Sequence, residues 1–261
     1  MNAATASTDV VRLALELPLA IVTLDRPAAK NSLRLDEMAA IAPAIGNAVS
    51  AGARAVLVRG TRDAFCAGRD LKDTRPDTDD TLAILRERIN PVLCAVRDCP
   101  VPTIAAVHGP ALGFGFGLAL ACDLAIVADN ALLGSPFRNI GAVLDSGGHH
   151  HLRERIGPHH AAELIFFGRL LSGREAAAMG LVNRSVAAEA LDAIALQTAR
   201  DIANGPTAAF AASKRILSRA RSFEETLDLE ALAQAEVLAG PDGIEGVRAF
   251  QEKRKPRFIG R

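Results

Sequence analysis

Two glycine-containing stretches of this chain have residue types that could bind an anionic oxygen. In the first, Gly113, Gly115 and Gly117 follow an apolar, β-branched run, and a helix is expected to begin near Phe114. The start of a helix presents unpaired backbone N–H groups and the positive end of the helix dipole. Glycine there lets a ligand approach the backbone closely, so the pattern favours an oxyanion as the ligand. The alternative is that these glycines only allow close helix packing.

Nucleotide-binding motifs do not explain this stretch. Leu118 stands where the third glycine of the dinucleotide-binding fingerprint belongs, and the chain contains no GxxxxGK[ST] phosphate loop. The second stretch, Ala64–Leu71, is expected to be a loop that faces the first.

Other groups that could take part in catalysis are weaker candidates. Histidines cluster at 149–151 and 159–160, but adjacent histidines on a helix point in different directions, and no Cys or carboxylate set completes a ligand count. We therefore expect no metal. Ser146 and His149 do not indicate a catalytic triad because no GxSxG turn is present, although His149 could line a pocket. Cys66 is expected to be a small buried residue.

The order of the expected elements indicates an α/β protein. Strand-like and helix-like runs alternate up to about residue 190, and nearly everything from Leu191 onward has a helical pattern. We predict an α/β core over residues 1–190 and a helical cap or oligomerisation region over residues 191–261. The expected strands are Val11–Leu17, Ala20–Asp25, Ala55–Val58, Thr103–Val107 and Asp123–Ala128; the expected helices are Arg34–Ser50 and Thr81–Arg97, the latter with Leu82, Leu85, Ile89, Val92 and Val96 inward; Leu133–Leu144 is expected to be irregular.

The composition excludes several classes of partner. Thirty Lys and Arg residues balance 30 Asp and Glu residues, which gives no electrostatic case for binding nucleic acid or an anionic membrane. The uncharged run Val101–Cys122 could span a bilayer by length, but Pro102, Gly109 and Pro110 interrupt it, so we expect buried core. The N-terminal sequence lacks the pattern of a signal peptide, and the four cysteines do not resemble a disulfide framework. Both features favour a cytoplasmic protein.

Four separated blocks of the sequence resemble the crotonase superfamily, the enoyl-CoA hydratase/isomerase family. They occur in the family's order between residues 25 and 254. The resemblance implies a spiral of ββα units with a C-terminal helical region, assembly as homotrimers or hexamers, and an acyl-CoA thioester as substrate. CoA would be part of the substrate, so no separate cofactor is expected. The blocks are Asp25-Arg26-Pro27 with Lys30–Leu33, Ala64–Leu71, His108–Asp123 and Phe250–Arg254.

The resemblance also implies roles for individual residues. The N–H groups of Arg69 and Phe114 would form an oxyanion hole for the thioester oxygen, which becomes an enolate when the neighbouring carbon loses a proton. Gly68 and Gly113 would keep the approach open. Lys253 could instead belong to a solvated helix end, and Asp70 could bond its own loop. The contacts implied for CoA phosphates are Arg26, Lys30 and Lys253, with Phe250 against adenine and Phe250 and Lys253 from a neighbouring subunit; further substrate contacts are Leu33, Ala67, Gly68, Asp70, Leu71, Gly113 and Phe137.

The acid–base residues depart from the family's hydratases, which carry two glutamates. The matching positions here hold Gly117 and Phe137. Asp145, in an apolar stretch that ends in Asp-Ser-Gly-Gly, lies where some isomerases and a dehalogenase of the family place a catalytic aspartate. This stretch most resembles the ring-opening isomerases of phenylacetyl-CoA catabolism. Apolar neighbours would raise the pKa of Asp145 and make it a better base, while the alternative for Asp145 is a helix N-cap.

Three functions therefore remain open. The first is an enoyl-CoA isomerase that shifts a double bond with Asp145 as its single proton shuttle. The second is an enoyl-CoA hydratase that works with this lone acid, and the third is an acyl-CoA-binding homologue without catalysis. A dehalogenase is disfavoured because it needs a histidine on the helix at 81–97, where Asn90 stands near the required place. Either Arg69 or Arg138 could direct a charge at the substrate.

Overall fold

A six-stranded sheet forms the centre of the protein. The computed structural model describes residues 10–72 and 74–261. Most of the N-terminal segment, in which no signal peptide is expected, therefore lies outside the described residues. The strand order is β1-β2-β3-β4-β6-β9, in which β1 and β2 are antiparallel and the remaining neighbours are parallel. The strands are β1 (Val11–Glu16), β2 (Leu19–Leu24), β3 (Ala55–Gly60), β4 (Thr103–Val107), β6 (Leu124–Ala128) and β9 (Arg184–Val186).

A second, three-stranded sheet lies beside the first. It consists of β5 (Pro110–Leu112), β7 (Leu132–Gly134) and β8 (Leu171–Ser172), in the order β5-β7-β8. β7 overlaps the stretch that was expected to be irregular, and β5 begins at Pro110, one of the residues that interrupt the uncharged run. These strands have two or three residues each, too few to give an alternating hydrophobic pattern in the sequence.

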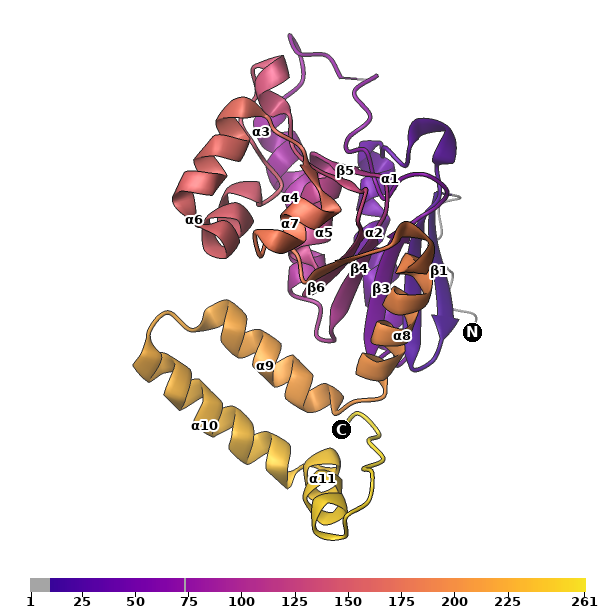
Figure 1. Cartoon of the computed structure of the whole chain (residues 1–261), viewed down its shortest axis with the longest axis vertical. Helices are drawn as coiled ribbons and strands as arrows, with labels where there is room; N and C mark the ends of the chain where they lie inside the picture. Colours follow the sequence, from indigo (N-terminus) through magenta and orange to yellow (C-terminus); the bar gives the residue numbers. More distant parts are fainter. Residues whose placement is uncertain (1–9, 73) are drawn as a thin grey trace.

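Helices surround both sheets (Figure 1). The predicted single helix at 34–50 was wrong, because the structure has two helices that meet at Ala40. Pro43 explains the break, since a proline ring inside a continuous helix clashes with the carbonyl four residues earlier, here that of Ala39. The helical segments before the C-terminal region are η1 (Pro27–Ala29), α1 (Leu35–Ala39), α2 (Ile41–Ser50), α3 (Thr81–Ala83), η2 (Ile84–Ile89), α4 (Asn90–Arg97), α5 (Phe114–Ala121), η3 (Phe137–Ile140), α6 (Gly148–Phe167), α7 (Gly173–Ala178) and η4 (Ala188–Ala190).

The helix predicted at 81–97 is confirmed as a helical stretch, but its inward face is not the predicted one throughout. Ile89, Val92 and Val96 are buried, whereas the side chain of Leu82 is 58% exposed. The segment η2 is a π-helix, which has more residues per turn than an α-helix. The wider turn rotates the first residues of the stretch away from the face that the later residues bury.

The long uncharged stretch is core, as predicted. It forms β4, β5 and α5, and every residue of β4 and of α5 is buried. Across the residues that the structure describes, no helix combines the length and the apolar character needed to cross a membrane.

The C-terminal region is helical, as predicted, and extends away from the sheet (Figure 1). Its first helix, α8 (Leu191–Ala203), packs on β3, β4 and β6. α9 (Thr207–Arg219) and α10 (Phe223–Ala239) run side by side, and α11 (Pro241–Gln251) contacts α10 at the far end.

Lys214 and Arg54 are two of the side chains that join this region to the core. The Lys214 ammonium on α9 lies 2.7 Å from the Asp123 carboxylate, which also accepts hydrogen bonds from the backbone N–H and the hydroxyl of Thr103. The Arg54 guanidinium donates to the carbonyl oxygen of Gly205, to the Thr207 hydroxyl and to the Phe258 carbonyl oxygen. Arg54 therefore joins the start of β3 to both the hinge before α9 and the C-terminal tail.

We expect Arg54→Ala to destabilise the protein by about 2–3 kcal/mol, because three acceptors lose a charged donor. Urea unfolding measures the loss, and limited proteolysis should show faster cleavage after residue 205. Arg200→Ala is the matched control, since the Arg200 side chain is half exposed and pairs with Glu16 at 3.3 Å. Such an exposed pair contributes less than about 1 kcal/mol. Equal stability of the two variants would contradict the proposed anchoring role of Arg54.

Candidate active site

Backbone hydrogen bonds bring the two glycine-containing stretches together. The N–H of Phe65 donates to the carbonyl of His108 at 2.8 Å, and that of Cys66 donates to Pro110 at 3.1 Å. In return, the N–H of Leu112 donates to the carbonyl of Cys66 at 2.9 Å. The loop after β3 thus pairs with β5 directly before α5 begins, so the expectation that these stretches face one another is confirmed.

Gly68 and Gly113 allow the close approach that the two predicted oxyanion donors need. Gly68 has φ +105°, and a Cβ atom there would lie 2.8 Å from the carbonyl oxygen of Leu112 and 3.8 Å from the backbone nitrogen of Phe114. Gly113 has φ +53° and precedes the first residue of α5. Both backbones are left-handed, which disfavours any residue with a side chain.

The N–H groups of Arg69 and Phe114 remain available. Among residues 10–72 and 74–261, neither N–H donates to a backbone or side-chain acceptor. Phe114 is the first residue of α5, where an N–H has no partner within the helix. Two unpaired donors thus lie on adjacent segments, an arrangement that could stabilise charge on a carbonyl oxygen.

A second strand-like contact fixes the other side of the loop. The N–H of Ala67 donates to Lys30, that of Leu33 to Gly68 and that of Asp70 to Leu33, all to carbonyl oxygens at 2.9–3.0 Å. The predicted binding residues between 30 and 70 therefore belong to one backbone network, which holds Arg69 between two bonded neighbours.

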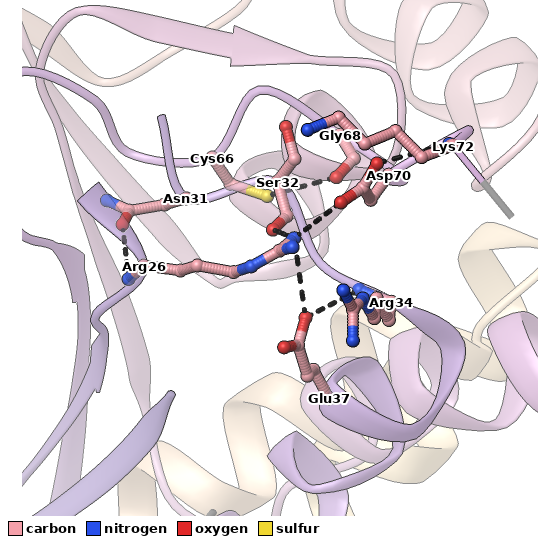
Figure 2. A network of polar contacts seen from close by, with 9 residues as sticks. All are labelled: Arg26, Asn31, Ser32, Arg34, Glu37, Cys66, Gly68, Asp70 and Lys72. Carbon is pink, nitrogen blue, oxygen red and sulfur yellow. Dashed lines mark hydrogen bonds and ion pairs between the residues drawn. The ribbon is translucent and has the colours of Figure 1, made fainter. Parts of the chain in front are cut away.

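An ion-pair network supports this loop from below (Figure 2). The guanidinium of Arg26 donates to a carboxylate oxygen of Asp70 at 2.7 Å and to the Ser32 carbonyl at 2.8 Å, and it lies 3.7 Å from the Glu37 carboxylate. The hydrogen bond from Arg26 holds the pKa of Asp70 below its usual range. Asp70 thus bonds its own loop, as one interpretation proposed. Arg26, predicted to meet a CoA phosphate, already has its charge engaged and positions the loop.

Asn31 is a buried residue that sequence reasoning did not single out as a support for this site. Its side-chain oxygen accepts from the N–H of Arg26 at 2.8 Å, and its amide nitrogen donates to the carbonyl oxygens of Thr61 and Ala64. Its backbone φ of +56° is tolerated by asparagine better than by most residues. Asn31 lies within the block Lys30–Leu33, but its residue type alone gave only a weak signal for this supporting role.

Asp145 directly precedes Ser146, which lies against Gly117 in the first turn of α5. Its Oδ1 atom is buried and makes no hydrogen bond with any described residue. Burial raises the pKa of Asp145, and the nearby Ser146 hydroxyl and Arg69 guanidinium oppose that rise. The alternative N-cap role is wrong, because the N-cap of α6 is Gly147 and Asp145 contributes only its backbone carbonyl, to the N–H of Gly148. The carboxylate is therefore free to act on a substrate.

Neighbouring residues occupy the space beside Gly113, which directly precedes α5, and beside Gly117 within α5. A Cβ atom on Gly113 would lie 3.2 Å from the ring of Phe137. A Cβ atom on Gly117 would lie 2.4 Å from both the Cβ and the carbonyl oxygen of Ser146. The position that holds a glutamate in the family's hydratases therefore has no room for a side chain unless Ser146 moves.

The two arginines left open by the sequence differ in placement. The Arg69 guanidinium lies 3.7 Å from Asp79 and its charge lowers the pKa of Asp145. The Arg138 side chain packs over Gly168, 2.8 Å from where a Cβ atom would stand there, at the end of α6. Arg69 is therefore the arginine whose charge acts on the candidate base.

Four other predicted contacts lie on the surface or far from this site. Lys30 and Leu71 are exposed at the edge of the loop. Phe250 is 85% exposed on α11, and Lys253 follows that helix. In Figure 1, α11 lies at the lower end of the long axis and β5 and α5 lie in the upper half, so the helix that carries Phe250 is remote from these site elements of its own chain.

The remaining titratable candidates have no chemistry at this site. Burial raises the pKa of the Cys66 thiol to about 12, so the thiol stays neutral. His149 is exposed, whereas His151 is partly buried and burial lowers its pKa to about 4. Across the described parts of the chain, no three His, Cys, Asp or Glu residues are arranged to hold a metal ion.

Comparison with known proteins agrees with this geometry. The sequence profile of the family described as enoyl-CoA hydratase/isomerase matches residues 16–261. A Rhodobacter capsulatus protein named "Probable enoyl-CoA hydratase" is 37% identical over 98% of this chain and 100% of its own. The human "Enoyl-CoA hydratase domain-containing protein 2, mitochondrial" is 34% identical over 92% of this chain and 85% of its own.

Solved structures show the same fold. The crystal structure of an enoyl-CoA hydratase from Mycobacterium smegmatis has a TM-score of 0.89 at 32% identity, and covers 95% of this chain and 98% of that one. The fold and the paired glycine-containing segments thus define an acyl-CoA enzyme of the crotonase type. The chain belongs to the enoyl-CoA hydratase/isomerase family.

Proposed function

We propose that this enzyme moves a double bond in an acyl-CoA thioester, from the 3,4 to the 2,3 position or in an equivalent ring, with Asp145 as its only acid–base residue. One observation carries this proposal. The first turn of α5 bears no carboxylate, and Ser146 fills the space beside Gly117. The residue before Ser146 is Asp145, whose Oδ1 atom is buried and has no hydrogen-bond partner among the described residues.

The proposed reaction conserves protons. Asp145 removes a proton from C2, which leaves an enolate whose oxygen accepts hydrogen bonds from the N–H groups of Arg69 and Phe114. The double bond shifts from C3–C4 to C2–C3 when the same carboxyl group returns the proton to C4. A raised pKa suits Asp145 for both steps, since a base works best with a pKa near the working pH.

A hydratase is the second candidate, and the names of the relatives favour it. Adding water needs a group that activates the water and a group that protonates C2. Gly117 and Phe137 stand where the family's hydratases carry their two glutamates, so Asp145 would have to fill both roles. A binding protein without turnover is the third candidate, and the same two substitutions support it.

One substrate comparison separates the three candidates. Purified protein is incubated in parallel with 3-hexenoyl-CoA and 2-hexenoyl-CoA, and the products are separated by chromatography. We expect conversion of the 3-enoyl to the 2-enoyl thioester with little 3-hydroxyacyl product. Predominant hydration of the 2-enoyl thioester would favour the hydratase, and tight binding without any turnover would favour the non-catalytic homologue.

The CoA end of the substrate requires a second chain in this proposal. Lys30 is exposed at the edge of the loop and is placed to meet a phosphate, whereas Phe250 and Lys253 can serve only the site of a neighbouring copy. We therefore retain homotrimers or hexamers, and a cytoplasmic location, as part of the proposal. The division of the chain at residue 190 and a preference for ring-type substrates also stay predictions.

A further inference from the structure

Ser146, the residue after Asp145, is unusual in its burial, its hydrogen bonding and its backbone conformation. It is 4% exposed, its Oγ atom is buried without a hydrogen-bond partner in the described structure, and its φ is +54°. A buried hydroxyl is normally hydrogen-bonded, and a serine rarely adopts a left-handed backbone. A residue that departs from both rules at a candidate active site suggests a functional constraint.

The left-handed turn at Ser146 presses this residue against α5. Gly147 follows with φ +76°, and together they turn the chain into α6. The Cβ and carbonyl oxygen of Ser146 lie against Gly117, one helical turn after Gly113, to whose carbonyl the N–H of Gly117 donates at 3.0 Å. Ser146 therefore contacts the same turn that carries the Phe114 donor.

The Ser146 hydroxyl and the Asp145 carboxylate complement each other. Among the described residues, Oδ1 of Asp145 is a buried acceptor without a donor. On the adjacent residue, Oγ of Ser146 is also buried and also has no hydrogen-bond partner there. A hydroxyl can donate to a carboxylate oxygen, so a small rotation of either side chain that brings Oγ into hydrogen-bond geometry with the carboxylate would satisfy both groups. The Ser146 hydroxyl is close enough to the Asp145 carboxylate to lower the pKa of that group.

We propose that Ser146 is the positioning residue of the base, whose hydroxyl donates to the Asp145 carboxylate while that group is ionised and aims its second oxygen at the substrate carbons. This inference rests on the proposed catalytic role of Asp145. When the carboxyl group holds the substrate proton, the donated bond weakens, so Ser146 favours the ionised form to which the enzyme returns in each turnover.

Few charged groups can disturb this pair. Arg69, from the loop after β3, is a charged residue that acts on the pair, and its positive charge lowers the pKa of Asp145. α5 has no titratable residue between Phe114 and Ala121, and Arg138 of the η3 segment packs over Gly168. On α6, His151 packs against Gly147 and has a pKa of about 4, set by burial and by Arg155, so its titration needs a separate control.

The test uses Ser146→Ala and Ser146→Gly in the full-length protein. Both remove the hydroxyl, but glycine adopts the left-handed turn without strain, so an effect shared by the two variants comes from the hydroxyl. With 3-hexenoyl-CoA, we expect kcat to fall about tenfold in both, in the range of one hydrogen bond to a charged group, with KM within about twofold. The acid limb of the kcat/KM profile should move to higher pH, because the ionised base loses a donor.

Controls separate this inference from the proposed function. Ser135→Ala removes another buried hydroxyl without a partner, which lines a small interior cavity near Leu144, and should leave the acid limb unchanged. His151→Gln shows whether an imidazole contributes to that limb. If Asp145→Asn is inactive but Ser146→Gly keeps the parental kcat and acid limb, the positioning role is wrong and the isomerase stands. If Asp145→Asn stays active, both fall.

Discussion

Asp145→Asn should lower isomerase turnover by about 10²–10⁴-fold while acyl-CoA binding persists. Asparagine has nearly the same shape and keeps a polar group at the same position, but it cannot accept a proton from C2. No second carboxylate compensates, because Gly117 and Phe137 occupy the two positions at which the family's hydratases carry glutamates. The measurements are single-turnover rates with 3-hexenoyl-CoA and calorimetric titration with a saturated acyl-CoA.

Asp129→Asn is the control for this effect. Asp129 pairs with Arg174 at 2.8 Å on the surface after β6, so its loss removes an ion pair without touching the site. Its turnover should match that of the parent enzyme. Retention of full turnover in Asp145→Asn would exclude the single-aspartate mechanism, and loss of CoA-ester binding would assign Asp145 to binding.

Gly68→Ala should lower kcat/KM by about 10²–10³-fold, the cost of losing one donor of an oxyanion hole. The added methyl group would lie 2.8 Å from the carbonyl oxygen of Leu112, so the loop must shift and carry the N–H of Arg69 with it. The steady-state rate with 3-hexenoyl-CoA measures the effect, and thermal unfolding shows whether the variant is folded.

Gly52→Ala is the control that separates displacement of the Arg69 N–H from the strain of placing alanine in a left-handed backbone. Gly52 also has a left-handed backbone, with φ +93°, but a Cβ atom there would meet nothing within 4 Å. This variant should lose stability and keep kcat/KM. A folded Gly68→Ala protein that loses no more activity than Gly52→Ala would show that the Arg69 N–H does not hold the thioester oxygen.

The strongest predictions from sequence concerned long patterns and glycines with a backbone role. Strand pairing at the N-terminus, the β4 strand and the start of α5 follow from hydrophobic periodicity and from where glycine and proline interrupt it. The strands β5, β7, β8 and β9 were missed because two or three residues give no period. The break at Ala40 could have been predicted from Pro43, whereas the π-helical segment η2 has no comparable sequence signal.

Sequence reasoning named candidate residues for the site but not the contacts between them. The resemblance to the family implies that Gly117 stands where its hydratases carry a carboxylate, but only coordinates show that Ser146 fills the space beside it. The left-handed backbone of Ser146 depends on tertiary packing, and no local pattern encodes it for a serine. Arg26 was assigned to phosphate because it is basic and near Lys30, while its partners Asp70 and Glu37 come from other segments.

A crystal structure with a bound, unreactive saturated acyl-CoA tests the mechanism most directly. The thioester oxygen should lie within about 3.2 Å of the backbone nitrogens of both Arg69 and Phe114, as hydrogen bonds require. A carboxylate oxygen of Asp145 should face C2 and C4 of the same acyl chain. A thioester oxygen bound away from these two nitrogens, or an Asp145 side chain directed to solvent, would contradict the mechanism.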